Sequence, residues 1–279
     1  MNNLQQKLHH LKWLKSAGIE YYCSTQKDSE NSLIKTLQQL SINNIEMESP
    51  IAQQPETPPA IIKKKTTLAA DSPMVTEARK LADSAGSLTD LRKAIENFDG
   101  CDLKKFATKT VFADGVTDAK IVLVGEAPGA TEDKQGIPFC GESGRLLDKM
   151  LASIGLCRTK NVYITNTIFW RPPANRRPTN EEMEICKPFV EKHIALIKPK
   201  LIILVGGTAT TSLLGKNEGI SYIRRNNYSY TNQYLSEPIH TTAIFHPAYL
   251  LRQPMQKKTT WYDLLKIQKF IKEKIGELK

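Results

Sequence analysis

Runs of apolar, β-branched residues that each end in a polar or glycine-rich segment constrain this sequence most. The three clearest runs occupy residues 121–124, 162–165 and 242–245. Such runs are typical of buried parallel strands, and strands that run the same way end on one edge of the sheet. Glu126, Asn166 and His246 follow these runs. The pattern therefore predicts a crevice that holds a carboxylate, an amide and an imidazole.

From about Ser87 onward, strand and helix patterns alternate along the chain. Strands are expected at 120–124, 162–166, 200–205 and 241–246, and helices at 88–98, 143–154, 180–197, 208–214 and 260–276. Thr179 followed three residues later by Glu182 is a capping-box signal for the third of these helices. Alternation of this kind predicts an α/β fold, a three-layer α/β/α sandwich around a central parallel four-stranded sheet.

The composition divides the chain into three regions. Residues 1–45 are expected to form a helical N-terminal extension, because leucines recur at helical spacing near its start. Residues 46–74 read as a Pro/Lys-rich, disordered linker. The compact domain is then expected to span residues 86–279.

The charge favours a polyanionic partner. The 279 residues carry a formal net charge of +10. Residues 1–85 hold 10 Lys/Arg against 9 Asp/Glu, so the excess belongs to the region that bears the predicted crevice.

The sequence predicts neither a membrane span nor secretion. No run of apolar residues is long enough to predict a membrane span, and Met1 is followed by polar residues rather than by a secretion signal. The five cysteines are scattered without a CxxC pair, which suits a reducing cytoplasm.

The loop after the first strand, residues 125–133, combines two glycines with three acids. It lacks the Gly-Lys-Ser/Thr ending of a P-loop, and its acids would repel a phosphate. Carboxylates such as Glu126 and Glu132 suit the activation of water, the support of a developing cation, or metal binding. A tight turn with solvated acids is the alternative.

Two further residues suit a flat ligand. Phe139, held by the preceding proline, could stack on a planar ring, although most phenylalanines belong to a core. The Asn166 amide both donates and accepts, so it can read a pyrimidine edge, whereas a turn or a cap is its structural alternative.

Two loops are candidates for contact with a polyanion. Residues 171–178 form a stiff segment with three arginines, which is suited to phosphates or is simply a solvated turn. Residues 249–251 could insert into a base stack as a wedge, with Arg252 beside them, unless they begin a buried helix.

Five motifs together resemble those of family 4 uracil-DNA glycosylases. They are Gly-Glu-Ala-Pro-Gly at 125–129, Gly-Ile-Pro-Phe-Cys-Gly at 136–141, Tyr-Ile-Thr-Asn at 163–166, Arg-Pro-Pro-Ala-Asn-Arg at 171–176 and His-Pro-Ala-Tyr-Leu-Leu-Arg at 246–252. They occur in the order and spacing of that family over about residues 95–275, and the first 85 residues lie outside the resemblance.

The resemblance implies that uracil is flipped out of DNA and its N-glycosidic bond hydrolysed, which leaves an abasic site in base excision repair. It implies that Phe139 stacks on the base, that Asn166 binds its edge, and that Glu126 lines the pocket. It further implies that His246 contacts uracil O2, and that Glu132 and Asn175 act on the water or the sugar. The expected DNA contacts are Arg171, Arg176, Tyr249, Leu250, Leu251 and Arg252.

The chain departs from the family at its iron–sulfur cluster, which four cysteines usually hold. Cys101 and Cys186 match two ligand positions, but Phe98 and Trp170 occupy the other two. We therefore expect no 4Fe-4S cluster and no other cofactor, with the two aromatic side chains filling its space.

Uracil-containing DNA is the expected partner, and a repair or replication protein could dock on residues 1–45. We expect a monomer in a bacterial-type cytoplasm, associated with the nucleoid when it acts, and no membrane contact. Two other functions fit the residues: a non-catalytic or covalent uracil-DNA binder, and a generic nucleotide-binding α/β hydrolase.

Overall fold

The computed structural model describes residues 72–278. The expected extension 1–45, and the expected linker up to residue 71, lie outside the described residues.

The described part is built on one six-stranded sheet of order β1-β3-β2-β4-β6-β5. The strands are β1 (Asp114–Gly115), β2 (Ile121–Gly125), β3 (Val162–Asn166), β4 (Leu201–Val205), β5 (Tyr228–Tyr230) and β6 (Ile239–Ile244). The four central strands are mutually parallel, whereas β1 and β5 pair antiparallel at the edges. The predicted parallel centre is confirmed, and the two short edge strands are additional.

The strand register brings the polar segments to one edge. Gly125 at the end of β2 lies opposite Asn166 at the end of β3, and Val205 of β4 lies opposite Ile244 of β6. Every residue of β2, β3 and β4 is buried, which is why these strands are apolar on both faces.

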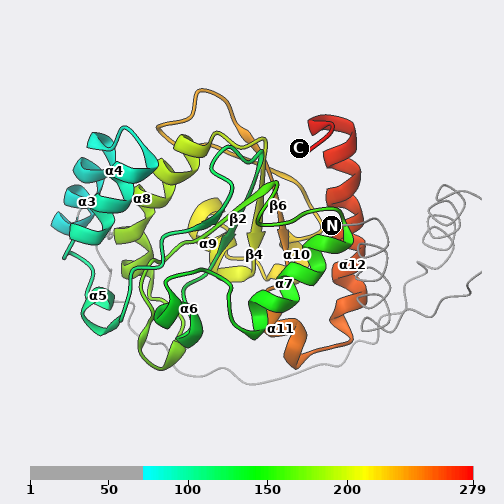
Figure 1. Cartoon of the computed structure of the whole chain (residues 1–279), viewed down its shortest axis with the longest axis horizontal. Coiled ribbons are helices and arrows are strands. Elements are labelled where there is room, and N and C mark those ends of the chain that lie inside the picture. The colour runs from blue at the N-terminus through cyan, green and yellow to red at the C-terminus, as the bar shows by residue number, and fades with distance from the viewer. Residues whose placement is uncertain (1–71, 279) are drawn as a thin grey trace, which may run out of the picture. The chain divides into compact units, whose positions relative to one another are not determined.

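Helices cover both faces of the sheet (Figure 1). They are α3 (Pro73–Ser84), α4 (Leu88–Asn97), α5 (Leu103–Phe106), α6 (Ala130–Gln135), α7 (Glu142–Ser153), α8 (Asn180–Ile197), α9 (Gly207–Leu214), α10 (Ile220–Ile223), α11 (Pro247–Arg252) and α12 (Gln256–Phe270), with short turns η2 (Pro173–Asn175) and η3 (Ile271–Ile275). Figure 1 shows α3, α4 and α8 grouped on one side of the sheet and α7, α11 and α12 on the other. None of the helices described is long and apolar enough to cross a lipid bilayer.

Helix α3 begins inside the segment that the sequence assigned to the linker. Ser72 caps it by accepting a hydrogen bond from the Met74 N–H, and Pro73 occupies its first turn. Val75, Ala78 and Ala82 are buried. The compact domain therefore starts by Pro73, earlier than the expected residue 86, because a short apolar stripe on α3 joins the core.

The C-terminal elements also differ from expectation. Strand β6 ends at Ile244, two residues before the predicted end, and His246 is the N-cap of α11. Helix α12 begins at Gln256 instead of residue 260. Helix α8, by contrast, has the predicted bounds and the predicted capping box of Thr179 and Glu182.

A buried histidine joins α8 to the sheet. His193 is 1% exposed, its Nε2 lies 2.7 Å from the Tyr163 hydroxyl, and its ring stacks on Phe112 at 4.3 Å. Burial lowers the pKa of His193 to about 3.

Acid should therefore destabilise the domain through His193. An unfolded histidine has a pKa of about 6.5, so the unfolded chain binds more protons than the folded one between about pH 3 and pH 6.5. This contribution to the unfolding free energy is complete above pH 6.5 and falls by about 2 kcal/mol at pH 5. Urea unfolding at pH 8 and pH 5 measures the loss.

A His193→Gln variant is the control, because its glutamine does not titrate. Its unfolding free energy should fall less between the two pH values than that of the wild type. Equal losses in the two proteins would show that His193 is not the group responsible.

Candidate active site

Phe139 and Asn166 face the same point at the end of β2. A Cβ atom placed on Gly125 would lie 2.4 Å from the Asn166 Oδ1 and 2.5 Å from Cε2 of the Phe139 ring. Neither approach leaves room for a side chain, so glycine is required at the end of this strand. The predicted convergence of the aromatic ring and the amide is thus present.

The Asn166 side chain has an unused acceptor. Asn166 is 2% exposed, and within residues 72–278 no donor pairs with its buried Oδ1. A buried acceptor without a partner costs about 1–3 kcal/mol, which makes such atoms rare in folded proteins. An N–H group of a ligand is the natural partner for this oxygen.

The His246 ring lies beside the Phe139 ring, with ring centroids 5.6 Å apart and planes inclined by 32°. Its Nδ1 accepts the Ala248 N–H at 3.1 Å, so the neutral ring carries its proton on Nε2. Burial, and then the positive charge of Arg252, lower the pKa of His246 to about 4, against the opposing charge of Glu132. At neutral pH this side chain is therefore an uncharged N–H donor.

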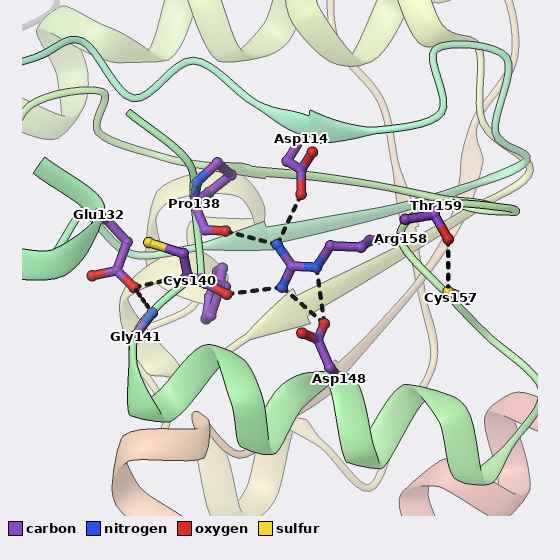
Figure 2. A network of polar contacts seen from close by, with 10 residues as sticks. Asp114, Glu132, Pro138, Cys140, Gly141, Asp148, Cys157, Arg158 and Thr159 are labelled. Carbon is purple, nitrogen blue, oxygen red and sulfur yellow. Dashed lines mark hydrogen bonds and ion pairs between the residues drawn. The ribbon is translucent and has the colours of Figure 1, made fainter. Parts of the chain in front are cut away.

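Glu132 holds the loop that carries Phe139. Its Oε1 accepts hydrogen bonds from the backbone N–H groups of Cys140 at 3.0 Å and Gly141 at 2.8 Å, as Figure 2 shows. The other carboxylate oxygen faces Gly129, where a Cβ would lie 2.8 Å from it. One oxygen of the predicted catalytic carboxylate is thus committed to the backbone.

The other two acids of this loop differ from each other. Asp133 is buried and accepts three hydrogen bonds from residues 108 and 109, which is a structural role. Glu126 is half-buried, and its backbone oxygen accepts bonds from Thr167 and Ile168, so its position follows the end of β3.

The arginine-rich loop is held together by its own contacts. Arg171 donates to Asn175 Oδ1 at 2.7 Å, and the Asn175 backbone is left-handed with φ of +54°. Arg176 binds both carboxylate oxygens of Glu182 at 2.9 and 2.5 Å, beside the capping box of α8. Arg176 is exposed and Arg171 is half-buried, and together they form a preformed basic edge.

The expected wedge is only partly available. Leu250 is 0% exposed and belongs to the core, so its expected insertion into DNA is not compatible with this conformation. Tyr249 and Leu251 are half-buried and Arg252 is exposed. Met255, just beyond α11, is 85% exposed, and the sequence pattern gave no reason to single it out.

The four residues at the positions that the family resemblance assigns to the cluster, Phe98, Cys101, Trp170 and Cys186, all belong to the buried core. The thiols of Cys101 and Cys186 hydrogen-bond to each other, which lowers the pKa of Cys101 and raises that of Cys186. Phe98 is fully buried and packs edge-on against Phe189, one helical turn after Cys186, with centroids 5.2 Å apart.

Trp170 is equally well packed. It is 1% exposed, its Nε1 donates to Thr110 Oγ1 at 3.0 Å, and it contacts Phe169, whose backbone interacts with the Cys186 thiol. Two thiols and two buried aromatic rings do not fit a cluster that needs four thiolates. Nor do the described residues contain a group of three or more His, Cys, Asp or Glu side chains that could hold a metal ion.

Sequence reasoning missed Arg158, which lies in the loop before β3. Its guanidinium lies at the centre of Figure 2, between Asp114, Pro138 and Asp148. Arg158 stands between Cys157 and Thr159 and belongs to none of the five motifs, so no local pattern marks it.

Comparison with known proteins defines the class of this fold and site. Residues 112–266 match the family described as the uracil DNA glycosylase superfamily. This range contains Gly125, Phe139, Asn166 and His246, the residues that lie close together at the end of β2.

The chain is 39% identical to the type-4 uracil-DNA glycosylase of Archaeoglobus fulgidus over 183 residues, which cover 65% of this chain and 92% of the relative. It is 36% identical to that of Thermotoga maritima over 182 residues, which cover 64% and 92% respectively. The match to that of Sulfurisphaera tokodaii is 35% over 184 residues, covering 65% and 84%. The chain therefore belongs to the type-4 uracil-DNA glycosylase family.

The His246 ring should stay neutral well below pH 7 and gain a proton only near pH 4, because burial opposes its charge. Nitrogen-15 NMR of the imidazole should show Nδ1 without a proton and Nε2 with one at pH 7. A His246→Ala variant assigns the signals. A titration midpoint of 6.5 or higher, or the opposite tautomer, would contradict the assignment.

Proposed function

We propose that this protein excises uracil from DNA by hydrolysing the N-glycosidic bond between uracil and deoxyribose. The unpaired Oδ1 of Asn166 beside the Phe139 ring is the observation that carries the proposal. Membership of a family whose relatives are named type-4 uracil-DNA glycosylase supports the same substrate.

Asn166 accounts for base selection. Uracil presents an N–H at position 3 and a carbonyl at position 4, which match an amide oxygen and an amide NH₂. Cytosine presents an acceptor at position 3 and would leave the buried Oδ1 unpaired, at a cost of about 1–3 kcal/mol. Phe139 stacks on the flipped base, and Glu126 lines the pocket where the methyl group of thymine must be refused.

His246 is proposed to accelerate cleavage of the N-glycosidic bond. When the glycosidic bond breaks, its electron pair goes to uracil, whose charge spreads to O2, and the sugar becomes an oxocarbenium ion. A neutral Nε2–H aimed at O2 stabilises that anion without giving up its proton. Water then adds to the sugar carbon and loses a proton, and the uracil anion gains one, which leaves an abasic site and free uracil.

Glu132 and Asn175 are proposed to act on the water or the sugar. The oxygen of Glu132 that does not hold the backbone can accept a proton from water or stabilise the cation. Asn175 is proposed to help place the water or the sugar, from the loop in which its Oδ1 accepts a hydrogen bond from Arg171.

DNA is proposed to lie along the basic edge and the α11 turn. Arg171, Arg176 and Arg252 would contact phosphates, whereas Tyr249 and Leu251 would help to fill the space that the flipped base vacates. Leu250 is left out because it is buried.

Beyond the domain, we propose that residues 1–45 dock a repair or replication protein. We further propose a monomer that works in the cytoplasm and associates with the nucleoid when it acts on DNA. Size-exclusion chromatography with light scattering tests the oligomeric state.

Incubation with uracil-containing oligonucleotides, followed by alkali, tests the proposed activity. Strand cleavage at uracil, but not at cytosine or thymine, is expected. A complex with uracil-DNA that survives denaturant would indicate covalent capture instead. Phosphate release from free nucleotides without uracil excision would indicate a generic nucleotide hydrolase.

Replacement of His246 by alanine should reduce the single-turnover excision rate roughly 100- to 1,000-fold, the usual effect of losing one oxyanion donor. Affinity for DNA with an uncleavable uracil analogue should change little, because the contact strengthens only as uracil leaves.

The matched control is His240→Ala, since His240 lies at the other end of β6 and stacks on Phe270. It should excise uracil at nearly the wild-type rate. Equal losses of rate and affinity in His246→Ala would refute the proposed role.

We also propose that the protein works without an iron–sulfur cluster, and that Phe98 and Trp170 supply the packing that stabilises this region. The burial of both rings and the hydrogen-bonded thiol pair support this. Purified wild-type protein should then lack iron and lack the brown colour of such clusters.

A Phe98→Cys, Trp170→Cys double variant should bind about four iron atoms after anaerobic reconstitution with iron and sulfide, since it restores four thiols. The single variant Phe98→Cys is the control and should not. Iron in the wild type would refute the proposal, and a double variant without iron would refute the ligand mapping.

A further inference from the structure

The backbone of Phe139 adopts a conformation that must be held in place. Its φ is +51°, in the left-handed region that side chains with a Cβ atom disfavour. Phe139 lies between α6 and α7, in a loop without a sheet partner. Because the residue is aromatic and not glycine, other contacts must stabilise this conformation.

Arg158 binds the backbone of this loop directly. Its NH2 group donates to the Phe139 carbonyl oxygen at 2.8 Å, and its NH1 group donates to the Pro138 carbonyl oxygen at 3.0 Å. Two consecutive carbonyl groups are thus fixed by one rigid, planar side chain. Their orientation sets the φ and ψ angles of Phe139.

The remaining donors of Arg158 attach it to the scaffold. Nε and NH2 donate to Asp148 Oδ1 on α7 at 2.9 and 2.8 Å, and NH1 donates to Asp114 Oδ2 on β1 at 2.9 Å. All five N–H bonds of the guanidinium are therefore used. Figure 2 shows the guanidinium between these groups, with α7 on one side and the edge strand on the other.

The guanidinium of this network is largely shielded from water, whereas the side chains of Asp114 and Asp148 are 35% and 46% exposed. The Arg158 side chain is 15% exposed, and burial raises the pKa of Asp148 although Arg158 partly offsets it. A lysine has a single ammonium group and could not reach both carbonyls and both carboxylates in one plane. The geometry therefore requires arginine at this position.

Helix α7 closes the other side of the loop. A Cβ on Gly144 would lie 1.7 Å from the Phe139 carbonyl oxygen, so the loop backbone packs directly on the helix. Between Gly144 and Arg158 the Phe139 backbone has little freedom to move. The ring consequently stays beside Gly125 and 5.6 Å from the His246 ring.

We infer that Arg158 is a positioning residue for uracil excision, which fixes the Phe139 ring in its stacking pose through the Pro138 and Phe139 carbonyls. The inference rests on the proposed function. It adds a group that touches neither base nor sugar and acts only through Phe139.

Arg158→Ala should reduce the single-turnover excision rate roughly 10- to 100-fold, the range expected when a reacting geometry is displaced by about 1 Å. Affinity for DNA without uracil should not change. Lys160→Ala is the matched control, because it removes a positive charge from an exposed position of the same loop. Its rate should equal that of the wild type.

A double-mutant cycle separates positioning from general stability. In a Phe139→Ala background, Arg158→Ala should lower the rate less than about 3-fold, since there is no ring left to position. A loss as large as in the wild-type background would overturn the inference.

Arg158→Lys keeps the charge between the carboxylates and guards against a variant that fails to fold. It should melt near the wild-type temperature and still lose excision rate. Wild-type rates in Arg158→Lys would overturn the inference, because charge alone would then suffice.

The two proposals fail in different ways. A wild type that does not excise uracil refutes the proposed function, and an active wild type with an equally active Arg158→Ala refutes the role of Arg158. A crystal structure of Arg158→Ala gives a readout without activity: Phe139 should leave the left-handed region, and an unchanged φ would refute the inference.

Discussion

The parallel pairing of β2 with β3, and of β4 with β6, is the interaction on which the site depends. It places Gly125 opposite Asn166 at one edge of the sheet, next to the segment that leads from β6 to His246. A shift of β3 by a single residue would turn the Asn166 side chain to the other face of the sheet. Burial of the strands on both sides makes such a shift costly, so the apolar strands fix the polar site.

The chemistry of the site comes from enclosure more than from charge. His246 is neutral because its half-buried ring is desolvated, and because its Nδ1 caps α11 the one proton stays on Nε2. Asn166 keeps an acceptor free for the same reason: it is enclosed by strand ends and an aromatic ring. A protonated histidine would be a stronger donor, but its burial would destabilise the fold.

The region around Phe98 and Trp170 shows how one framework can be stabilised in two ways. The family resemblance places four thiolates around a metal cluster at these positions, whereas this chain has two thiols and two buried aromatic side chains. In this chain the connection consists of edge-on aromatic contacts and a hydrogen bond between Cys101 and Cys186.

The sequence alone determined the α/β class, the four parallel strands, the bounds of α8 and the residues that approach Gly125, because apolar periodicity, capping signals and short motifs are local. It did not predict α3, the edge strands β1 and β5, or the early end of β6, whose patterns are too short to stand out. Only the tertiary structure placed Leu250 in the core and Arg158 on the Phe139 loop. Burial and hydrogen bonds between residues 19 to 44 positions apart depend on how distant segments pack, and no local pattern contains that information.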